Sequence, residues 1–485
     1  MRLLIFTVLI LLVVFSQVNA QSTKRDSFTV LYEKDSCKMV DPSKLVVIGD
    51  ISLKGNNLTR DRIIMREMEL SEGDTLNMHA FCRLAMQSRS NLLNRGLFNF
   101  VTVDTTMANG NHPIINLEYS FIERWYVWPM PIFELADRNF NSWLDSKDWS
   151  RVNYGAFITH NNFRGRMEKL KLLLRAGYNQ NFMLRYEIPY LTHKQDLGMG
   201  VWIGHSRSRE IPYAISNDKL VFYKNELGYA RNDLYANLLI TYRKGYRNLH
   251  TFMFGFERYN YADTLLDLNS DFTVDRSLKA TYLNFYYQFK HDRRDYLPYP
   301  LSGHYYDIEF MKRGLGFPDK KPDFYYIRTT FDVYTPIANR WFWATNLTAK
   351  ISGGGQQPFH MRRGLGYGND FVRSYELYVI DGESFGLMKN NLKFAVLTPR
   401  VTNINFLPTE RFSKIHYAIY ANIFFDGGYV SSDKPWPDSR MQNKLIYGTG
   451  IGLDFVTYYD MVFRIEYGIN MFNETGFFLH FVAPI

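Results

Sequence analysis

Alternation of apolar and polar residues dominates the chain after residue 125. The clearest example is the segment 282–290, in which the two kinds alternate without interruption: Leu283, Asn284, Phe285, Tyr286, Tyr287, Gln288, Phe289 and Lys290. Successive side chains of a β-strand point to opposite faces. A wall of such strands has an apolar outside and a polar inside, which is the pattern of a membrane β-barrel.

Sixteen segments of this kind follow one another, separated by turns rich in Gly, Pro, Asn and Asp. They span residues 126–136, 151–160, 168–178, 182–191, 197–207, 233–246, 251–262, 280–292, 303–314, 324–337, 341–353, 389–399, 416–430, 445–458, 461–471 and 476–485. One further apolar segment, 219–229, is assigned to the third outside loop instead of the wall. An even number of strands is typical of single-chain bacterial barrels. The sequence therefore predicts an all-β, 16-stranded transmembrane barrel over residues 123–485.

The pattern before this region differs. Residues 45–56 predict a strand, Thr59 is expected to cap a helix over 60–70, and residues 77–95 predict a second helix. Gly96 is expected to end that helix in a left-handed conformation, after which Leu97 and Phe98 return to the core. Two strands joined by the turn NGNHP follow. The order strand, helix, helix, strand, strand predicts a small α+β domain over residues 45–122.

The first twenty residues predict a secretory signal peptide: a basic Arg2, an apolar run and small residues at the cleavage site. The apolar run is too short to cross a bilayer as a helix. Residues 21–44 are polar and predict a linker.

Composition agrees with a barrel. Aromatic residues make up 17% of the chain, yet the mean hydropathy is only −0.27. The net charge of +9 is spread along the chain without a basic block, which indicates either ordinary solvated charge or attraction to anionic lipid headgroups and argues against nucleic acid as a partner.

An oxidising compartment would permit a disulfide between Cys37 and Cys82, the two cysteines. Alternatively, Cys82 simply packs on a helix face. Neither cysteine has a metal-ligand spacing, and no metal or cofactor is expected.

A segment with eight glycines, residues 353–386, separates two of the strands. A loop of this length is usually functional or disordered, and its apolar centre argues against disorder. The candidate site lies at that centre and comprises Val372, Arg373, Ser374 and Tyr375. Glycines 364, 366 and 368 lack the strand–glycine–helix context and the Lys-Ser/Thr of a phosphate-binding loop, so they predict tight turning instead.

Several motifs, in this order, resemble the BamA/TamA superfamily of outer-membrane assembly factors, also called bacterial surface antigens. NLLNRGLFNFVTVD resembles the POTRA signature, with Gly96, Leu97 and Phe98 at its centre. NNFRGRMEKLKL, RYEIPYL and HDRRDYLPYPLSGHYY resemble turns and strand ends of the barrel. VRSYE matches the motif of the sixth extracellular loop, and FFDGGYV and YGTGIGL resemble the two strands that follow. The resemblance covers about residues 45–485. It implies a single POTRA domain in the periplasm and a barrel in the outer membrane of a Gram-negative-type bacterium, with residues 353–386 folded back into the barrel.

The resemblance also implies a contact between this loop and the strand that carries Phe425, Asp426, Gly427 and Gly428. The alternation of that strand places Asp426 in the lumen, where its carboxylate could form a charge-assisted pair with Arg373. The alternative is an ordinary lumen charge that meets water.

The first and last strands imply a lateral seam. Pro129 and Pro131 cannot donate to a ladder and belong at strand edges or starts. The last strand contains Pro484 and a signal-like pattern of Gly476, Phe478 and Phe481. The family is expected to open at this seam and to pair client strands there, although both prolines could also lie just outside the paired region.

The sequence departs from the family pattern in three places. Ser374 stands where the loop motif usually has glycine, the chain ends in Ile485 where such barrels usually end in an aromatic residue, and only one POTRA domain fits.

The leading hypothesis is a non-enzymatic factor for outer-membrane protein assembly, insertion or translocation. Its POTRA domain would capture client β-strands and the seam would insert them. The expected partners are unfolded outer-membrane or surface proteins, the lipid bilayer with its anionic outer-membrane lipids, and periplasmic accessory proteins.

The alternative is a passive channel for small solutes. A barrel enzyme would need a histidine beside an Asp or Ser, and the adjacent pairs are His205 with Ser206 and His291 with Asp292. Neighbours in a strand point to opposite faces, so neither pair forms a dyad, and no catalytic residue is predicted.

Overall fold

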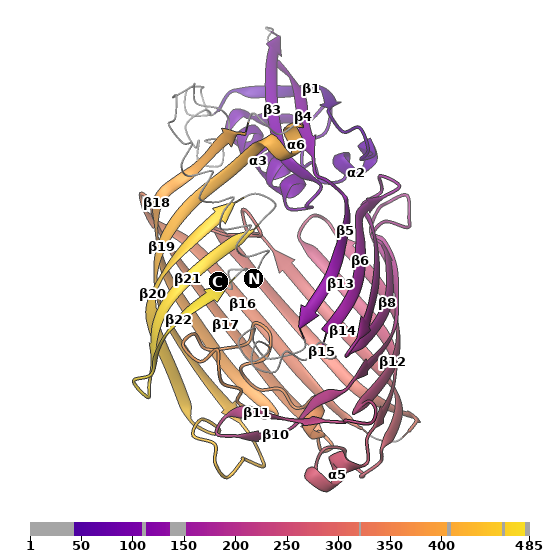
Figure 1. The fold of residues 1–485 in the computed structure, drawn as a ribbon. Coiled ribbons are helices and arrows are strands. Elements are labelled where there is room, and N and C mark those ends of the chain that lie inside the picture. The colour runs from indigo at the N-terminus through magenta and orange to yellow at the C-terminus, as the bar shows by residue number, and fades with distance from the viewer. Residues whose placement is uncertain are drawn as a thin grey trace.

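The structure is a computed structural model that describes residues 43–108, 113–135, 152–319, 322–404, 409–457 and 461–480. The predicted signal peptide, most of the predicted linker, Cys37, Phe481, Pro484 and Ile485 lie outside these residues. The described chain consists of a small N-terminal domain and a large barrel (Figure 1).

The N-terminal domain packs two helices on one four-stranded sheet. Its elements are β1 (Leu45–Lys54), α2 (Asp61–Met65), β2 (Thr75–Asn77), α3 (Met78–Leu93), β3 (Phe98–Ala108) and β4 (Ile114–Glu123). The sheet order is β2-β1-β4-β3, with β1 parallel to β4. As predicted, Gly96 follows α3 with a φ of 69°, and Leu97 and Phe98 are buried in the core.

The prediction that Thr59 caps the first helix is wrong. Its hydroxyl lies 3.0 Å from the hydroxyl of Tyr126 and accepts a hydrogen bond of 2.9 Å from Nδ2 of Asn162. Tyr126 lies in the link between the domains and Asn162 in the barrel. The hydroxyl of Thr59 therefore makes tertiary contacts instead of capping the helix. Helix α2 is also shorter than expected and ends at Met65.

The barrel is one 16-stranded antiparallel sheet, as predicted. Its strands are β5 (Val127–Leu135), β6 (Val152–Phe163), β7 (Glu168–Gly177), β8 (Gln180–Ile188), β9 (Leu197–Ser208), β12 (Arg231–Lys244), β13 (Asn248–Tyr261), β14 (Lys279–Asp292), β15 (Gly303–Pro318), β16 (Phe324–Ala338), β17 (Trp341–Gly354), β18 (Ser384–Asn403), β19 (Lys414–Ser431), β20 (Leu445–Thr457), β21 (Val462–Asn470) and β22 (Thr475–His480). The segment assigned to an outside loop does lie outside the wall: β10 (Glu210–Ser216) and β11 (Lys219–Lys224) form a separate hairpin. Two short helices, α5 (Thr264–Leu268) and α6 (Glu410–Ser413), lie between strands.

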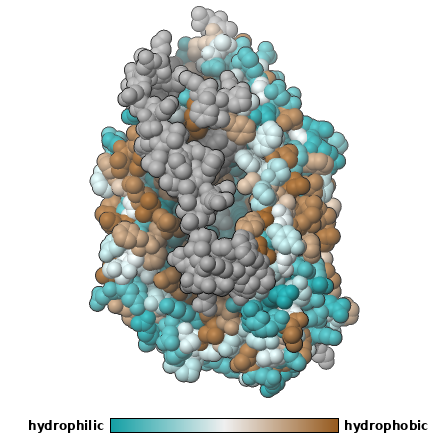
Figure 2. All heavy atoms as spheres, viewed as in Figure 1, coloured by the Kyte–Doolittle hydropathy of each residue, from teal (hydrophilic) through white to brown (hydrophobic). Residues whose placement is uncertain are grey.

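Apolar side chains cover the outside of the barrel. On β19, Ile423 and Phe425 are exposed, whereas Asn422, Phe424 and Asp426 are buried on the inner face. Hydrophobic residues gather over the middle of the barrel and hydrophilic ones toward its lower end (Figure 2). A belt of exposed apolar residues this large indicates a surface that contacts lipid. No helix in the described part of the chain is long and apolar enough to span a membrane.

The two ends of the barrel sheet are not paired with each other in the described residues. The strand order begins at β22 and ends at β5, with no ladder between them. Pro129 and Pro131 lie inside the ladder between β5 and β6, opposite Ile158 and Ala156. The alternative that these prolines lie outside the paired region is therefore wrong. Because proline is tolerated in an edge strand where its nitrogen faces away from the neighbouring strand, both prolines deprive the free edge of β5 of donors.

The N-terminal domain docks over one mouth of the barrel (Figure 1). Glu67, between α2 and β2, is fully buried at this contact. It accepts a 2.8 Å hydrogen bond from Nη2 of Arg243 at the end of β12 and a 2.9 Å bond from the hydroxyl of Tyr190. Arg95 lies 3.5 Å away. Burial opposes ionisation of Glu67, but the surrounding arginines outweigh it and lower the pKa of the carboxyl from 4.5 to about 2.

Glu67→Gln is expected to weaken the docking by about 3 kcal/mol, because it leaves buried guanidinium groups without their carboxylate. Limited proteolysis of the purified protein would report the release of the N-terminal domain. Glu118→Gln is the matched control, since the pair of Glu118 with Lys54 is exposed and spans 3.8 Å. Because the pKa of Glu67 is lower in the folded protein, its contribution is full above about pH 4.5 and is lost as the pH falls toward 2. Equal protection of both variants would contradict this role.

Candidate functional site

The long loop between β17 and β18 folds into the barrel. It contains a short 3-10 helix, η3 (Phe359–Met361). Val372, Tyr375 and Ile380 of the loop are buried in one cluster with Val430 and Ile446 of the wall. The prediction that the apolar centre of the loop is buried is therefore correct, although Leu377 is 74% exposed.

Arg373 fixes this loop to the wall. It is completely buried and donates from Nε and Nη2 to the two carboxylate oxygens of Asp426, at 2.7 and 2.6 Å. Its backbone N–H also donates to Asp426, at 3.2 Å. Nη1 donates to Glu466 at 3.1 Å and to Asn391 at 3.3 Å. The guanidinium lies 4.1 Å from the centre of the Phe424 ring. Bidentate pairs of this kind are the strongest hydrogen bonds a side chain offers, and the predicted contact of Arg373 with Asp426 is present.

The strand opposite the loop contributes alternate residues only. Asp426 and Gly428 face the loop, and a Cβ built at Gly428 would lie 2.7 Å from Val372. Phe425 is 48% exposed on the other face, and a Cβ built at Gly427 would meet only the backbone oxygen of Ile446, at 3.8 Å. Of the four predicted contact residues, the structure therefore brings two to the loop.

Two wall glycines allow the loop to approach closely. A Cβ at Gly448 would lie 2.1 Å from the carbonyl oxygen of Arg373, and a Cβ at Gly468 would lie 2.1 Å from Oγ of Ser374. Any larger residue would push the loop away from β20 and β21. Gly448 belongs to the YGTGIGL segment of β20, and Gly468 lies on β21.

Ser374 adopts a left-handed backbone conformation that favours glycine. Its φ is 75°, in the left-handed region that costs residues with a Cβ about 1–2 kcal/mol. Its hydroxyl is buried and has no hydrogen-bond partner. Serine at this position of the motif therefore strains the loop backbone locally.

Further contacts hold the loop around the lumen. Asp370 accepts a 2.8 Å hydrogen bond from Arg328 on β16. The hydroxyl of Tyr375 donates to the backbone oxygen of Tyr447 at 3.1 Å. The backbone N–H of Val379 donates to the oxygen of Asp218, in the β10–β11 turn, at 2.8 Å. Besides Asp426, the loop thus contacts two further strands of the wall, β16 and β20, and the separate β10–β11 hairpin.

An ion-pair chain continues from the loop toward the mouth where the N-terminal domain docks. Glu466 lies 3.7 Å from Nε of Arg464. Arg464 donates from Nε and Nη2 to the two carboxylate oxygens of Asp454, at 2.6 and 2.8 Å. Asp454 also accepts a 2.7 Å bond from Tyr299, in the turn between β14 and β15. All three charged groups are at most 1% exposed.

Sequence reasoning missed Glu466, Gly448 and Gly468. A signal was present, because Arg464, Glu466 and Gly468 alternate along one face of the strand 461–471, next to apolar residues on the other. Alternation identifies the inner face of a strand, but it does not show which inner residues meet a loop from another part of the chain.

The other predicted residues are placed as follows. Gly476 and Phe478 lie on β22 opposite Gly468 and Glu466. Cys82 is buried on α3 and disulfide-bonded. His205 contacts Asn232 while Ser206 bonds Asp233, so this adjacent pair does not form a dyad. His291 contacts Asn248.

Comparison with known proteins identifies the first domain and the fold. Residues 46–124 match the POTRA family, described as surface antigen variable number repeat, so the N-terminal domain is a POTRA domain. CdiB from Escherichia coli is similar in structure, with a TM-score of 0.52 and 13% identity over 91% of this chain and 74% of that chain. BamA from Haemophilus ducreyi lacking POTRA domains 1–3 gives a TM-score of 0.48 and 16% identity, over 90% of this chain and 83% of that one. At these identities the likeness concerns the fold alone. No curated protein matches in sequence.

Arg373→Ala and Asp426→Asn are each expected to destabilise the inserted loop by about 3–5 kcal/mol, because each leaves a buried charge without its partner. The barrel should still form. In a double-mutant cycle, the two substitutions should together cost much less than the sum of the single costs. Trypsin cleavage within the loop and thermal unfolding would measure this. Arg363→Ala, at an exposed position of the same loop, is the matched control. Additive costs would contradict the pair.

Ser374→Gly is expected to stabilise the protein by about 1 kcal/mol, since relief of left-handed strain and of an unpaired hydroxyl outweighs the added freedom of the unfolded chain. Ser374→Ala removes the hydroxyl but keeps the Cβ, so it should gain less. Thermal unfolding of the three proteins would test the order Gly, Ala, Ser, and a destabilised glycine variant would refute the strain.

Proposed function

We propose that this chain is an outer-membrane assembly, insertion or translocation factor for other proteins, with its POTRA domain in the periplasm. The observation that carries the proposal is the break in the barrel sheet. Neither β5 nor β22 has a second neighbour in the described residues, and an unpaired strand edge is a template for another strand. The barrel fold shared with CdiB and the POTRA domain support the same class of function.

A second free edge lies in the POTRA domain. Strand β3 pairs only with β4, within the part of the chain that the structure describes. Its end carries exposed Asp104, Thr105, Thr106 and Met107. A client segment in extended conformation could add to this edge through backbone hydrogen bonds. We propose that clients pair first with β3 and then with the seam, as unfolded outer-membrane or surface proteins.

The proposed mechanism uses no cofactor and no covalent chemistry. A backbone group in lipid must find a partner, so each client strand gains hydrogen bonds when it pairs at the seam and buries its polar backbone. Burial of the client's apolar face in the bilayer supplies the driving force. The protein itself would remain non-enzymatic. The bilayer, with its anionic lipids, is a second partner, and periplasmic accessory proteins are a third.

The channel hypothesis is less well supported. The loop anchored by Arg373 occupies the lumen, and the POTRA domain docks at one mouth. A passive pore for small solutes would need neither an inserted loop nor a docked POTRA domain. High steady conductance that survives deletion of residues 45–122 would favour the channel.

Depletion of the protein in its host, followed by quantitative outer-membrane proteomics, tests the proposal. We expect barrel or surface proteins to fall in abundance: many for a general insertase, one or two for a dedicated partner. Complementation with Arg363→Ala should restore them, whereas Arg373→Ala should restore them only in part. An unchanged proteome would overturn the proposal.

A further inference from the structure

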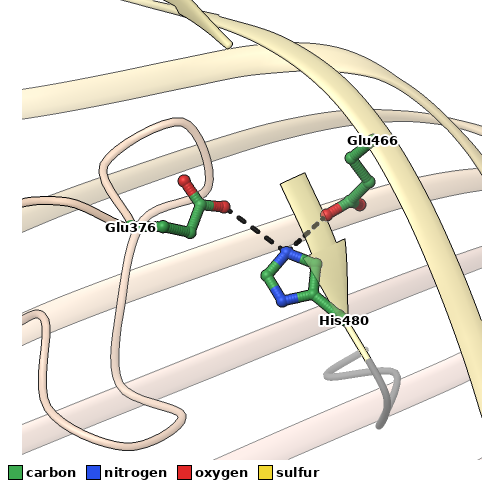
Figure 3. A group of neighbouring side chains, drawn as sticks. All are labelled: Glu376, Glu466 and His480. Atoms are coloured by element: carbon green, nitrogen blue, oxygen red, sulfur yellow. Dashed lines mark ion pairs between the residues drawn. The ribbon is translucent and has the colours of Figure 1, made fainter. Parts of the chain in front are cut away.

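Three potential metal ligands meet beside Arg373, where the inserted loop touches the last two strands. They are Glu376 on the loop, Glu466 on β21 and His480 on β22 (Figure 3). Nε2 of His480 lies 3.3 Å from a carboxylate oxygen of Glu466 and 3.5 Å from one of Glu376. All the potential ligand atoms lie within 4.8 Å of one another.

Hydrogen bonding does not account for this arrangement. Both carboxylate oxygens of Glu376, Oε2 of Glu466 and Nε2 of His480 are buried without a hydrogen-bond partner. Glu466 is 1% exposed. Its other oxygen accepts the bond from Arg373, so Oε2 alone points toward the other two residues. Apart from the two contacts of 3.3 and 3.5 Å with His480, these oxygens have no polar partner. Buried oxygens without a hydrogen bond are costly and usually mark a missing partner.

The spacing of these atoms fits a bound cation better than an ion pair. A charge-assisted hydrogen bond from imidazole to carboxylate is typically about 2.7–2.9 Å long. Zinc binds nitrogen and oxygen at about 2.0–2.2 Å in a tetrahedron, which sets neighbouring ligand atoms about 3.3–3.6 Å apart. The two distances to Nε2 of His480, 3.3 and 3.5 Å, fall in this range.

We propose that Glu376, Glu466 and His480 bind one divalent transition cation of the zinc class. One imidazole and two carboxylates suit such a cation, whereas calcium and magnesium prefer oxygen ligands alone. The three residues leave a fourth position for water, as in zinc sites that keep an open coordination site.

Residues around the three ligands are arranged as an outer shell. The hydrogen bond from Arg373 orients the Glu466 carboxylate, which is the role that second-shell donors have in metal sites. The ring of Phe371 stacks on His480, with centroids 5.7 Å apart and an angle of 19° between the planes. Phe371 and Arg373 both belong to the inserted loop, so the loop must be in place for the site to exist.

The position of the site gives it a role in the seam. His480 is on β22, the strand at one end of the barrel sheet. A cation held there would fasten the inserted loop to the terminal strand, so that the strand could move only after the metal left or the loop shifted. The metal binding stands independently, and only this locking role rests on the proposed function.

Titration of chelator-treated, detergent-purified protein with Zn²⁺, combined with elemental analysis, tests the site. We expect one equivalent to bind, and Glu376→Gln and His480→Gln each to lower the affinity at least tenfold. Glu383→Gln, in the same loop, and His205→Gln, in the wall, are matched controls and should bind as the unmodified chain does. Absence of zinc binding, or equal affinity in the ligand and control variants, would overturn the site.

Thermal unfolding separates the site from the function. Zn²⁺ should raise the unfolding temperature of the unmodified chain and of Glu383→Gln, but not of Glu376→Gln. This measurement needs no client protein. The metal site can therefore be confirmed even if the depletion experiment overturns the proposed function, and it can be refuted while the proposed function stands. An equal shift in all variants would place the zinc elsewhere and refute the assignment.

Discussion

A buried guanidinium that lacks its carboxylate partner costs about 3–5 kcal/mol, and Arg373 shows how this constraint organises the barrel. Its charge is fully buried, so the carboxylate of Asp426 must lie opposite it and Glu466 beside it. The loop can leave the lumen only if these groups are separated, at a cost of several kcal/mol. The glycines of β20 and β21 serve the same contact, because a side chain at Gly448 or Gly468 would push the loop at Arg373 and Ser374 away from the wall.

Buried ion pairs fix the structure at two places, inside the barrel and at the docking mouth. From Arg373 the chain of ion pairs passes through Glu466 and Arg464 to Asp454. At the docking mouth a separate group, Glu67 with Arg243, joins the POTRA domain to the barrel. Apolar packing alone would allow the loop and the domain to slide, whereas paired charges with fixed geometry specify one position. The apolar outer surface of the barrel faces lipid, so it does not help to position the loop or the domain.

The seam between β5 and β22 has fewer strand-pairing contacts than the rest of the barrel. Fourteen strands have two neighbours, while β5 and β22 have one each in the described residues, and the prolines of β5 remove donors from its free edge. Strong contacts at the loop and a weak edge lie close together, because Glu466 and His480 belong to the last two strands. This closeness is the basis for a cation that would join loop and edge.

The sequence by itself determined the strands and their faces, because alternation with period two depends only on which residues meet lipid and which meet the lumen. It predicted all sixteen strands, the position of segment 219–229 outside the wall, and the left-handed end at Gly96, but not the strand β10 that pairs with this segment. The resemblance of the loop motif to the family, together with the alternation that places Asp426 in the lumen, implied the pair of Arg373 with Asp426. Only the tertiary structure decided that Thr59 faces Asn162 instead of capping a helix, that Glu67 is the docking residue, and that Glu466, Glu376 and His480 meet. Thr59 and Asn162, Glu67 and Arg243, and Glu376 and Glu466 are 90 or more positions apart in the chain. No local pattern records which inner face of a strand lies opposite which loop or domain.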